Sequence, residues 1–401
     1  MGLLERGIRL RRAPSAAVTV LPPPDRVVLP LLWGERPLVR PGQRVLRGQR
    51  IADGGGTLPL HASVSGTVVD MGHHRTPDGL RRPALVVESD GAMEPSPAQT
   101  RRAVLDDLDD AALLSLLYEA GIRLPDGTPL ADAAADAGPG LQTLILCAMD
   151  GEPDLCTEDA VLCSDGETAL SGIRLLERLL RPRRVLLAVG ARQKQAAAAA
   201  GRWCGGRLQL AMMPERYPYA HPQLLAEELG GQMPGQTSRE AGVLVLPVTA
   251  AAAAGLAAYD GLPAVDVPVC VAWDGGRAVY RVPAGTPVRA VLRAAGQPAE
   301  HVLLGGPMTG RELVNPDGPI LQGFPGLTVR RPDRPLPATA CIRCGRCAAV
   351  CPVDLLPWMS QLRRAQPVWH GCLDCGACQY VCPANLPLLD AMGRRTPAAV
   401  G

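Results

Sequence analysis

Two short cysteine blocks near the C-terminal end constrain this chain more than any other feature. The first reads CIRCGRCAAVCP at residues 341–352, and the second reads CLDCGACQYVCP at residues 372–383. Together they hold eight of the thirteen cysteines, each block at the spacing C-x₂-C-x₂-C-x₃-C-P. The blocks also share a glycine and a valine, so we interpret them as two copies of one motif.

This spacing is typical of ferredoxin modules that hold two [4Fe–4S] clusters. Three cysteines of a block wrap a tight loop around one cluster, and the fourth, followed by proline, reaches the other cluster. We therefore predict one cluster on Cys341, Cys344, Cys347 and Cys382, and another on Cys372, Cys375, Cys378 and Cys351. Zinc knuckles use two plus two ligands with a longer intervening loop. A secreted disulfide scaffold does not suit a long chain with clustered cysteines.

The rest of the composition excludes several functions. The net charge near +2 predicts no general attraction to nucleic acid or to anionic lipid. Lys194 is the only lysine, which excludes a P-loop lysine and a lysine nucleophile elsewhere. The other five cysteines lack ligand spacing, and we expect them to be small buried side chains: Cys147, Cys156, Cys163, Cys204 and Cys270.

One uncharged stretch raises the question of a membrane span. Residues 241–259 carry no charge, which is close to spanning length. Pro247 divides the stretch, however, and much of it is alanine. We predict a buried strand followed by a helix that ends at Asp260-Gly261. The first residues lack the apolar core of a secretory signal, so we expect a soluble chain in the cytoplasm.

The fold class predicted is a multidomain α+β protein of four parts. Short β runs between residues 36 and 91 indicate a β barrel-sandwich like the biotinyl or lipoyl carriers, although its expected tip, Ser63–Ser65, has no lysine to modify. Alternating helix and strand indicates an α/β domain, with helices at 104–121 and 168–182 and strands at 141–149 and 183–190. The predicted domains are 1–95 (barrel-sandwich), 100–262 (α/β), 263–328 (β-grasp) and 335–395 (two-cluster ferredoxin).

The order of these parts and several motifs resemble the C subunit of the Rnf (Rsx) complex, the ion-pumping ferredoxin:NAD⁺ oxidoreductase of bacteria. The motifs are PLHASVSGTV, TLILCAMDGEP, ERYP, LLGGPMTG, CIRCGRC and GACQYVCPANLPL, and they cover nearly the whole chain. The resemblance implies a complex I flavin-subunit-like α/β domain and a soluble-ligand-binding β-grasp. It also implies a peripheral subunit on the cytoplasmic face of the inner membrane, with the other Rnf subunits as partners. There it would pass electrons between NAD(H) or ferredoxin and the membrane subunits, coupled to Na⁺ or H⁺ movement.

The expected flavin site departs from the family pattern. A glycine-rich loop like GGAGFPT is replaced by AGIRLPDGTPLADAAADAG, and the motif like NGAECEP reads CAMDGEP, which keeps Glu152 and Pro153. The QNVAT-like strand end reads LPVTA, and ERYPYAHPQLL lacks the usual Gln-Gly after YP. Glycine lets backbone amides approach a phosphate or a flavin ring closely. We therefore predict weak or absent FMN at a degenerate site near Glu152 and Pro153.

Two other functions remain open from the sequence. One is a non-catalytic electron-wiring subunit that keeps the clusters but has lost flavin and NADH chemistry. The other is a stand-alone iron–sulfur reductase resembling cobalamin reductase, although that family places its barrel toward the C-terminus. Reduction of the clusters by nucleotide in the purified chain would separate these alternatives.

Overall fold

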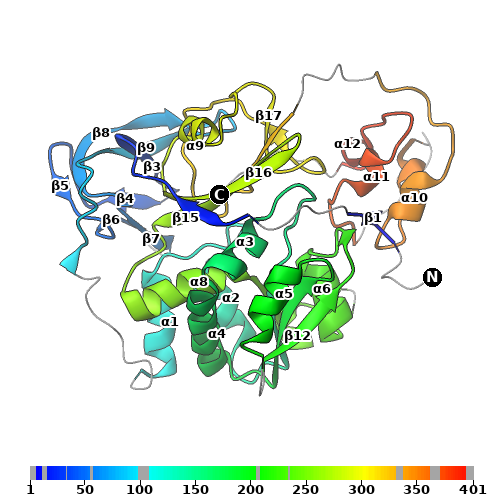
Figure 1. The fold of residues 1–401 in the computed structure, drawn as a ribbon, viewed down its shortest axis with the longest axis horizontal. Helices are drawn as coiled ribbons and strands as arrows, with labels where there is room; N and C mark the ends of the chain where they lie inside the picture. Colours follow the sequence, from blue (N-terminus) through cyan, green and yellow to red (C-terminus); the bar gives the residue numbers. More distant parts are fainter. Residues whose placement is uncertain are drawn as a thin grey trace.

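The computed structural model describes residues 6–10, 16–32, 34–54, 57–97, 108–204, 208–233, 235–330, 337–361 and 371–393. Figure 1 shows an α/β domain in green, with a β barrel-sandwich in blue and a β-grasp part in yellow along one side of it. The cysteine-rich module, in orange and red, packs at one end. The predicted multidomain class, with barrel-sandwich, α/β and ferredoxin-like parts, is confirmed.

The barrel-sandwich consists of two facing antiparallel sheets. One has the order β3-β9-β8-β5 and the other has the order β4-β6-β7. The strands are β3 (Arg26–Pro30), β4 (Glu35–Pro37), β5 (Arg44–Val45), β6 (Arg50–Gly54), β7 (Thr57–His61), β8 (Gly66–Arg75) and β9 (Arg81–Ser89). Leu29, Ile51 and Leu85 are fully buried in the shared core, as expected for sheets that each bury one face.

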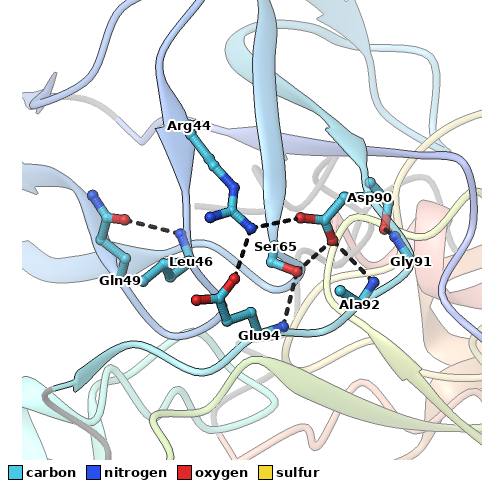
Figure 2. A network of polar contacts seen from close by, with 9 residues as sticks. Arg44, Leu46, Gln49, Ser65, Asp90, Gly91, Ala92 and Glu94 are labelled. Atoms are coloured by element: carbon cyan, nitrogen blue, oxygen red, sulfur yellow. Dashed lines mark hydrogen bonds and ion pairs between the residues drawn. The ribbon is translucent and has the colours of Figure 1, made fainter.

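The segment that would form the tip of a carrier domain is instead buried here. Ser65 accepts a hydrogen bond from the backbone N–H of Glu94 at 2.9 Å and donates one to Asp90 at 2.6 Å. Arg44 bridges the carboxylates of Asp90 and Glu94 (Figure 2). The hydroxyl of Ser63 donates to the carbonyl of Ala284 in the β-grasp part. This segment therefore fixes one domain against another.

The α/β domain contains a parallel sheet of order β12-β11-β10-β14. Its strands are β10 (Thr143–Cys147), β11 (Arg184–Gly190), β12 (Leu208–Met213) and β14 (Val243–Pro247). All five residues of β10 are buried, because helices cover both faces of a parallel sheet. The strand order reverses between β10 and β14, which is where an open α/β sheet usually binds a ligand.

The helices of this domain are α1 (Asp110–Glu119), α2 (Leu130–Ala137), α3 (Thr157–Ser164), α4 (Gly166–Leu180), α5 (Lys194–Gly201), α6 (Pro222–Gly230), α7 (Ser238–Ala241) and α8 (Val248–Gly255). Of these, α1, α4 and α8 lie close to helices that the sequence predicted. The predicted start of the first helix, at residue 104, lies outside the described residues. Asp109 caps α1 by accepting from the backbone N–H of Ala112 at 2.8 Å. Gly121 follows the helix end with φ +67°, as a helix-terminating glycine should.

The uncharged stretch folds as the sequence predicts. It forms β14, then α8, and then a single π-helical turn (Leu256–Asp260) that ends at Gly261 with φ +62°. Among the described residues, no helix combines the length and the apolar character that crossing a bilayer requires.

The β-grasp part has a six-stranded sheet of order β18-β17-β19-β15-β16-β2, with α9 (Val288–Ala294) packed on it. Its strands are β2 (Val18–Val20), β15 (Asp266–Trp273), β16 (Gly276–Pro283), β17 (Val302–Leu304), β18 (Arg311–Glu312) and β19 (Leu327–Val329). A further strand, β1 (Ile8–Arg9), pairs with β13 (Arg216–Tyr217) of the α/β domain. The range 1–95 predicted for the barrel thus contains two strands that belong elsewhere, because each completes an edge of another sheet.

The cysteine-rich module is built from short helical segments, two of which start in the same way. It contains α10 (Arg346–Val350), α11 (Ala377–Tyr380), α12 (Leu388–Ala391) and a 3₁₀ turn (Pro357–Gln361). Gly345 precedes α10 with φ +75°, and Gly376 precedes α11 with φ +72°. Both glycines adopt the left-handed conformation that costs other residues free energy, which explains why each block carries one.

Candidate functional site

The structure groups the eight motif cysteines around two cavities. The first cavity is lined by Cys351, Cys372, Cys375 and Cys378. The second is lined by Cys341, Cys344, Cys347 and Cys382. Each cavity thus receives three cysteines from one block and the fourth from the other block. The last cysteine of each block reaches the other cavity because the short helix and the following proline turn the chain between them.

The donors suit a metal cluster better than a single ion. Within the described ranges, no three His, Cys, Asp or Glu side chains converge closely enough to hold one metal ion, whereas zinc needs four sulfurs about 2.3 Å from one point. The first cavity is otherwise lined by apolar residues. Burial raises the pKa of Cys375 to about 11 and that of Cys378 to about 12. Metal binding at these thiols would therefore release protons.

The first cavity faces the rest of the protein. The hydroxyl of Tyr217 donates to the carbonyl oxygen of Cys375. A Cβ atom on Gly376 would lie 2.4 Å from the carbonyl oxygen of Met308, so the two backbones meet only because residue 376 is glycine. Tyr217, Met308 and Ala377 pack in one small apolar cluster with Leu10. The module is therefore docked through the residues around Cys375.

The N-terminal segment supports the same contact. Arg6 forms an ion pair with Asp354 and donates to the carbonyl oxygen of Cys351 at 3.4 Å. Gly7 lies so close to the carbonyl of Tyr217 that a Cβ atom would stand 2.2 Å from that oxygen. The segment thus lies between the α/β domain and the module, and it contacts both.

Glu152, one of the two residues predicted near a degenerate flavin site, contacts protein groups. Its carboxylate accepts from the backbone N–H groups of Met308 at 3.0 Å and Thr309 at 2.9 Å, and from the hydroxyl of Thr309. Burial raises the pKa of Glu152, while these hydrogen bonds lower it. The turn at 305–310 therefore binds a carboxylate of the α/β domain with its amides. Pro153 follows on the same loop and is half-buried.

In the loop that replaces the glycine-rich segment, backbone N–H groups donate hydrogen bonds to other groups of the chain. The N–H of Arg123 donates to the side chain of Gln322 at 2.9 Å. The N–H groups of Leu124 and Leu130 donate to the carbonyls of Thr128 and Ile122. A phosphate cradle needs backbone N–H groups that can donate to the phosphate. The N–H groups of Arg123, Leu124 and Leu130 already donate to groups of the chain.

The start of α8, at the point where the strand order reverses, is also occupied by a side chain. Glu158 accepts from the backbone N–H of Thr249 at 2.9 Å and from its hydroxyl at 2.8 Å. Burial, together with the nearby charge of Asp150, raises the pKa of Glu158 to about 8. A carboxyl group of this chain thus takes the place where a helix N-terminus would receive an anionic ligand. The acidic stretch 150–159 thus contains a carboxyl group with a structural role.

Three of the five other cysteines are buried, and the thiols of two of these contact each other. Cys147, Cys156 and Cys270 are buried, while Cys163 and Cys204 are half-buried. The sulfur atoms of Cys156 and Cys270 lie 3.7 Å apart, between the α/β domain and the β-grasp sheet. Sequence reasoning missed this pair because 114 residues separate its members.

Comparison with known proteins shows which family the chain resembles. The model of the RnfC barrel sandwich hybrid domain matches residues 6–92, and that of the 4Fe-4S dicluster domain matches residues 340–386. The chain is 33% identical over 372 residues to the C subunit of the ion-translocating oxidoreductase complex of Pseudomonas aeruginosa, covering 87% of this chain and 47% of that protein. The chain belongs to the family formed by the C subunits of ion-translocating oxidoreductase complexes.

Other members of this family match in the same way. The C subunit of Pectobacterium carotovorum is 33% identical, with 85% of this chain and 49% of that protein covered. That of Yersinia pestis is 31% identical, with 86% and 60% covered. The chain thus spans about half the length of the first relatives it matches. A solved structure of an NAD⁺-reducing [NiFe]-hydrogenase aligns with a TM-score of 0.45 and 19% identity over 58% of this chain and 49% of that one.

Proposed function

We propose that this chain is a peripheral iron–sulfur subunit of a membrane-bound Rnf-type electron-transport complex. It relays electrons between NAD(H) or ferredoxin and the membrane subunits, whose electron transfer is coupled to ion translocation. The observation that carries the proposal is the pair of cavities, each lined by four cysteines. We assign a [4Fe–4S] cluster to each, held by the eight cysteines in the two groups described above. The names of the relatives support an oxidoreductase complex as the setting.

The chain's own residues would hold and shield these clusters. Eight thiolates supply the ligands, and the bound clusters would supply one-electron redox chemistry. Tyr217 and Met308 hold the Cys375 loop against the α/β domain, so the first cavity lies between that domain and the second cavity. Apolar residues around the first cavity, such as Leu373 and Leu389, exclude water from it. This order gives electrons a path from the α/β domain through the first cavity to the second cavity.

A form of this function without flavin is favoured by a second set of observations. The amides of Arg123 and Leu124 and the start of α8 at Thr249 bind groups of the chain itself. We therefore propose that the chain receives electrons from a partner subunit and passes them through its clusters, with FMN bound weakly or not at all.

We further propose that the chain associates with the cytoplasmic face of the inner membrane through partner subunits. Its net charge near +2 is too small to attract it to lipid by itself. It should sediment with membranes only when the integral subunits are present, and high salt or a chaotrope should release it. Retention on protein-free liposomes at physiological salt would contradict this arrangement.

The proposed function is tested by cluster content and electron transfer together. Protein purified without oxygen should carry about eight iron and eight labile sulfide per chain. Reduction of these clusters by NADH in the isolated chain would assign nucleotide chemistry to it. Reduction only by an added one-electron donor supports the wiring form. About two zinc per chain with no sulfide would overturn the proposal.

A further inference from the structure

The second cavity lies at an outer surface of the cysteine-rich module. The contacts described between the module and the rest of the protein involve residues at or beside the first cavity, such as Cys351, Cys375 and Gly376. In contrast, Cys344 of the second cavity is exposed, and Ile342 beside it leaves 66% of its surface exposed. A cluster held at this cavity would therefore lie close to solvent.

The side chains around this exposed edge carry positive charge. Arg343 lines the second cavity, and Arg346 begins α10 one turn away; both are exposed. Neither forms an ion pair with another residue in the part of the chain that the structure describes. None of the described residues that line the second cavity is acidic. We call the surface of Ile342, Arg343, Cys344 and Arg346 the basic edge.

Two acidic residues of the module, Asp354 and Asp374, lie near the first cavity. Asp374 accepts a weak hydrogen bond from the thiol of Cys372, at 3.6 Å from its sulfur, and Asp354 pairs with Arg6 beside Cys351. Among the described residues, the surroundings of the two cavities thus differ: Asp354 and Asp374 lie beside the first cavity, and Arg343 and Arg346, which form no ion pair with a described residue, lie beside the second. Such a distribution selects a partner by charge and accelerates its approach.

We propose that the basic edge is the docking site for an acidic one-electron carrier protein that exchanges electrons with the outer cluster. The proposal rests on the proposed function, since it needs a cluster at the second cavity. Ile342 supplies the apolar contact at the centre, and Arg343 and Arg346 pair with carboxylates of the partner around it. The exchange moves one electron between the two proteins, so that one is oxidised as the other is reduced. The arginines stay charged throughout, and no proton is required.

The test measures electron transfer into the oxidised, cluster-loaded chain by stopped flow. Reduced plant-type ferredoxin serves as the acidic protein donor, and reduced methyl viologen, a small cation, serves as the second donor. In the double variant Arg343→Glu, Arg346→Glu, the rate from ferredoxin at low salt should fall on the order of tenfold. The rate from methyl viologen should stay equal or rise. The matched control is Arg36→Glu, Arg40→Glu, which alters two exposed arginines of the barrel by the same charge and should change neither rate.

Two results would overturn this inference. One is an unchanged ferredoxin rate in the Arg343, Arg346 variant, and the other is an equal loss in the Arg36, Arg40 control. Iron and sulfide content, measured on every variant, separates these results from failure of the proposed function. If the parent chain holds no clusters, the proposed function itself fails. If clusters are present and the rate from ferredoxin does not depend on the basic edge, only the docking site fails.

Discussion

The carboxylate of Glu152 accepts a hydrogen bond from the backbone N–H of Thr309 at 2.9 Å, across the boundary between the α/β domain and the β-grasp part. The neighbouring residue Met308 faces Gly376 of the cysteine-rich module with its carbonyl. One carboxylate thus orients a turn that connects three parts of the protein. We infer that Glu152 fixes this junction, near the place where the sequence predicted a degenerate flavin site.

Alanine substitutions at the two glycines of the cysteine blocks measure how much the contact with Met308 contributes to stability. Gly376 and Gly345 have the same left-handed backbone, but an added Cβ atom meets the carbonyl of Met308 only at Gly376. Both alanine variants carry the backbone cost of about 1 kcal/mol. Gly376→Ala should cost roughly 1–3 kcal/mol more, because backbone must move to relieve the clash. Denaturant unfolding, followed by loss of the visible absorbance of the clusters, measures the difference.

Gly345→Ala is the matched control for this experiment, since an added Cβ atom there has no neighbouring atom within 4 Å. Equal losses of stability in the two variants would mean that the module does not dock through Met308. A larger loss in Gly376→Ala supports the contact.

The two groups of cysteines predict separable effects of single substitutions. Cys344 lines the second cavity and Cys375 lines the first. Cys344→Ala should damage one cluster and Cys375→Ala the other, each lowering iron toward half of the parent value. The control Cys204→Ala changes a half-buried thiol outside both blocks and should keep the full iron content. Electron paramagnetic resonance of the reduced variants identifies which signal is lost, and loss of the same signal in both would contradict the grouping.

Local patterns explain what the sequence could predict. The cysteine spacing is complete within twelve residues, so it predicted both groups of four that the structure brings together. The strand β10 was predicted because a fully buried parallel strand reads as a continuous apolar run. Gly121 and Gly261 were predicted as helix ends for a similarly local reason, since each sits directly after a helical pattern and needs a positive φ.

Long-range contacts explain what the sequence could not predict. The hydrogen bonds from Thr309 to Glu152 span 157 residues, and nothing near either residue signals the other. The strands β1 and β2 have two and three residues, too few for a period-two pattern, and each is specified by the edge strand it completes. The role of Glu158 depends on Thr249, 91 residues away, so the residues around Glu158 could not indicate it.

The flavin content of the purified protein should be low. The amides of Arg123, Leu124 and Thr249 donate to groups of the chain itself, so binding the FMN phosphate there would first require breaking these bonds. Fluorimetry of flavin released by acid from fully cluster-loaded protein should find well below one FMN per chain. A parallel sample supplied with FMN during purification controls for loss of a weakly held flavin. One FMN per chain, reducible by NADH, would contradict the prediction and indicate ordinary flavin chemistry.

Glu158 should make the protein less stable as the pH rises from about 5 to 8. Its pKa is raised from 4.5 to about 8 by burial, so between these values the folded state holds a proton that the unfolded state has released. Stability from this group is therefore present below pH 4.5 and is lost as the pH rises through 8. Glutamine resembles the protonated carboxyl group, and the hydroxyl of Thr249 can accept as well as donate. Glu158→Gln should therefore match the parent near pH 5.

The difference should appear at higher pH, where only the parent must ionise this half-buried carboxyl group. By pH 8, Glu158→Gln should be more stable than the parent by on the order of 2 kcal/mol. This difference is smaller than the full pKa shift would give, because water partly screens the half-buried side chain. Urea unfolding at pH 5, 6.5 and 8 measures this trend. Glu312→Gln, at an exposed position, is the control and should follow the parent at every pH. If the unfolding free energies of Glu158→Gln and of the parent changed with pH in parallel, the prediction would be wrong. Glu158 would then already be ionised at pH 5, as a carboxylate that accepts hydrogen bonds at the start of α8.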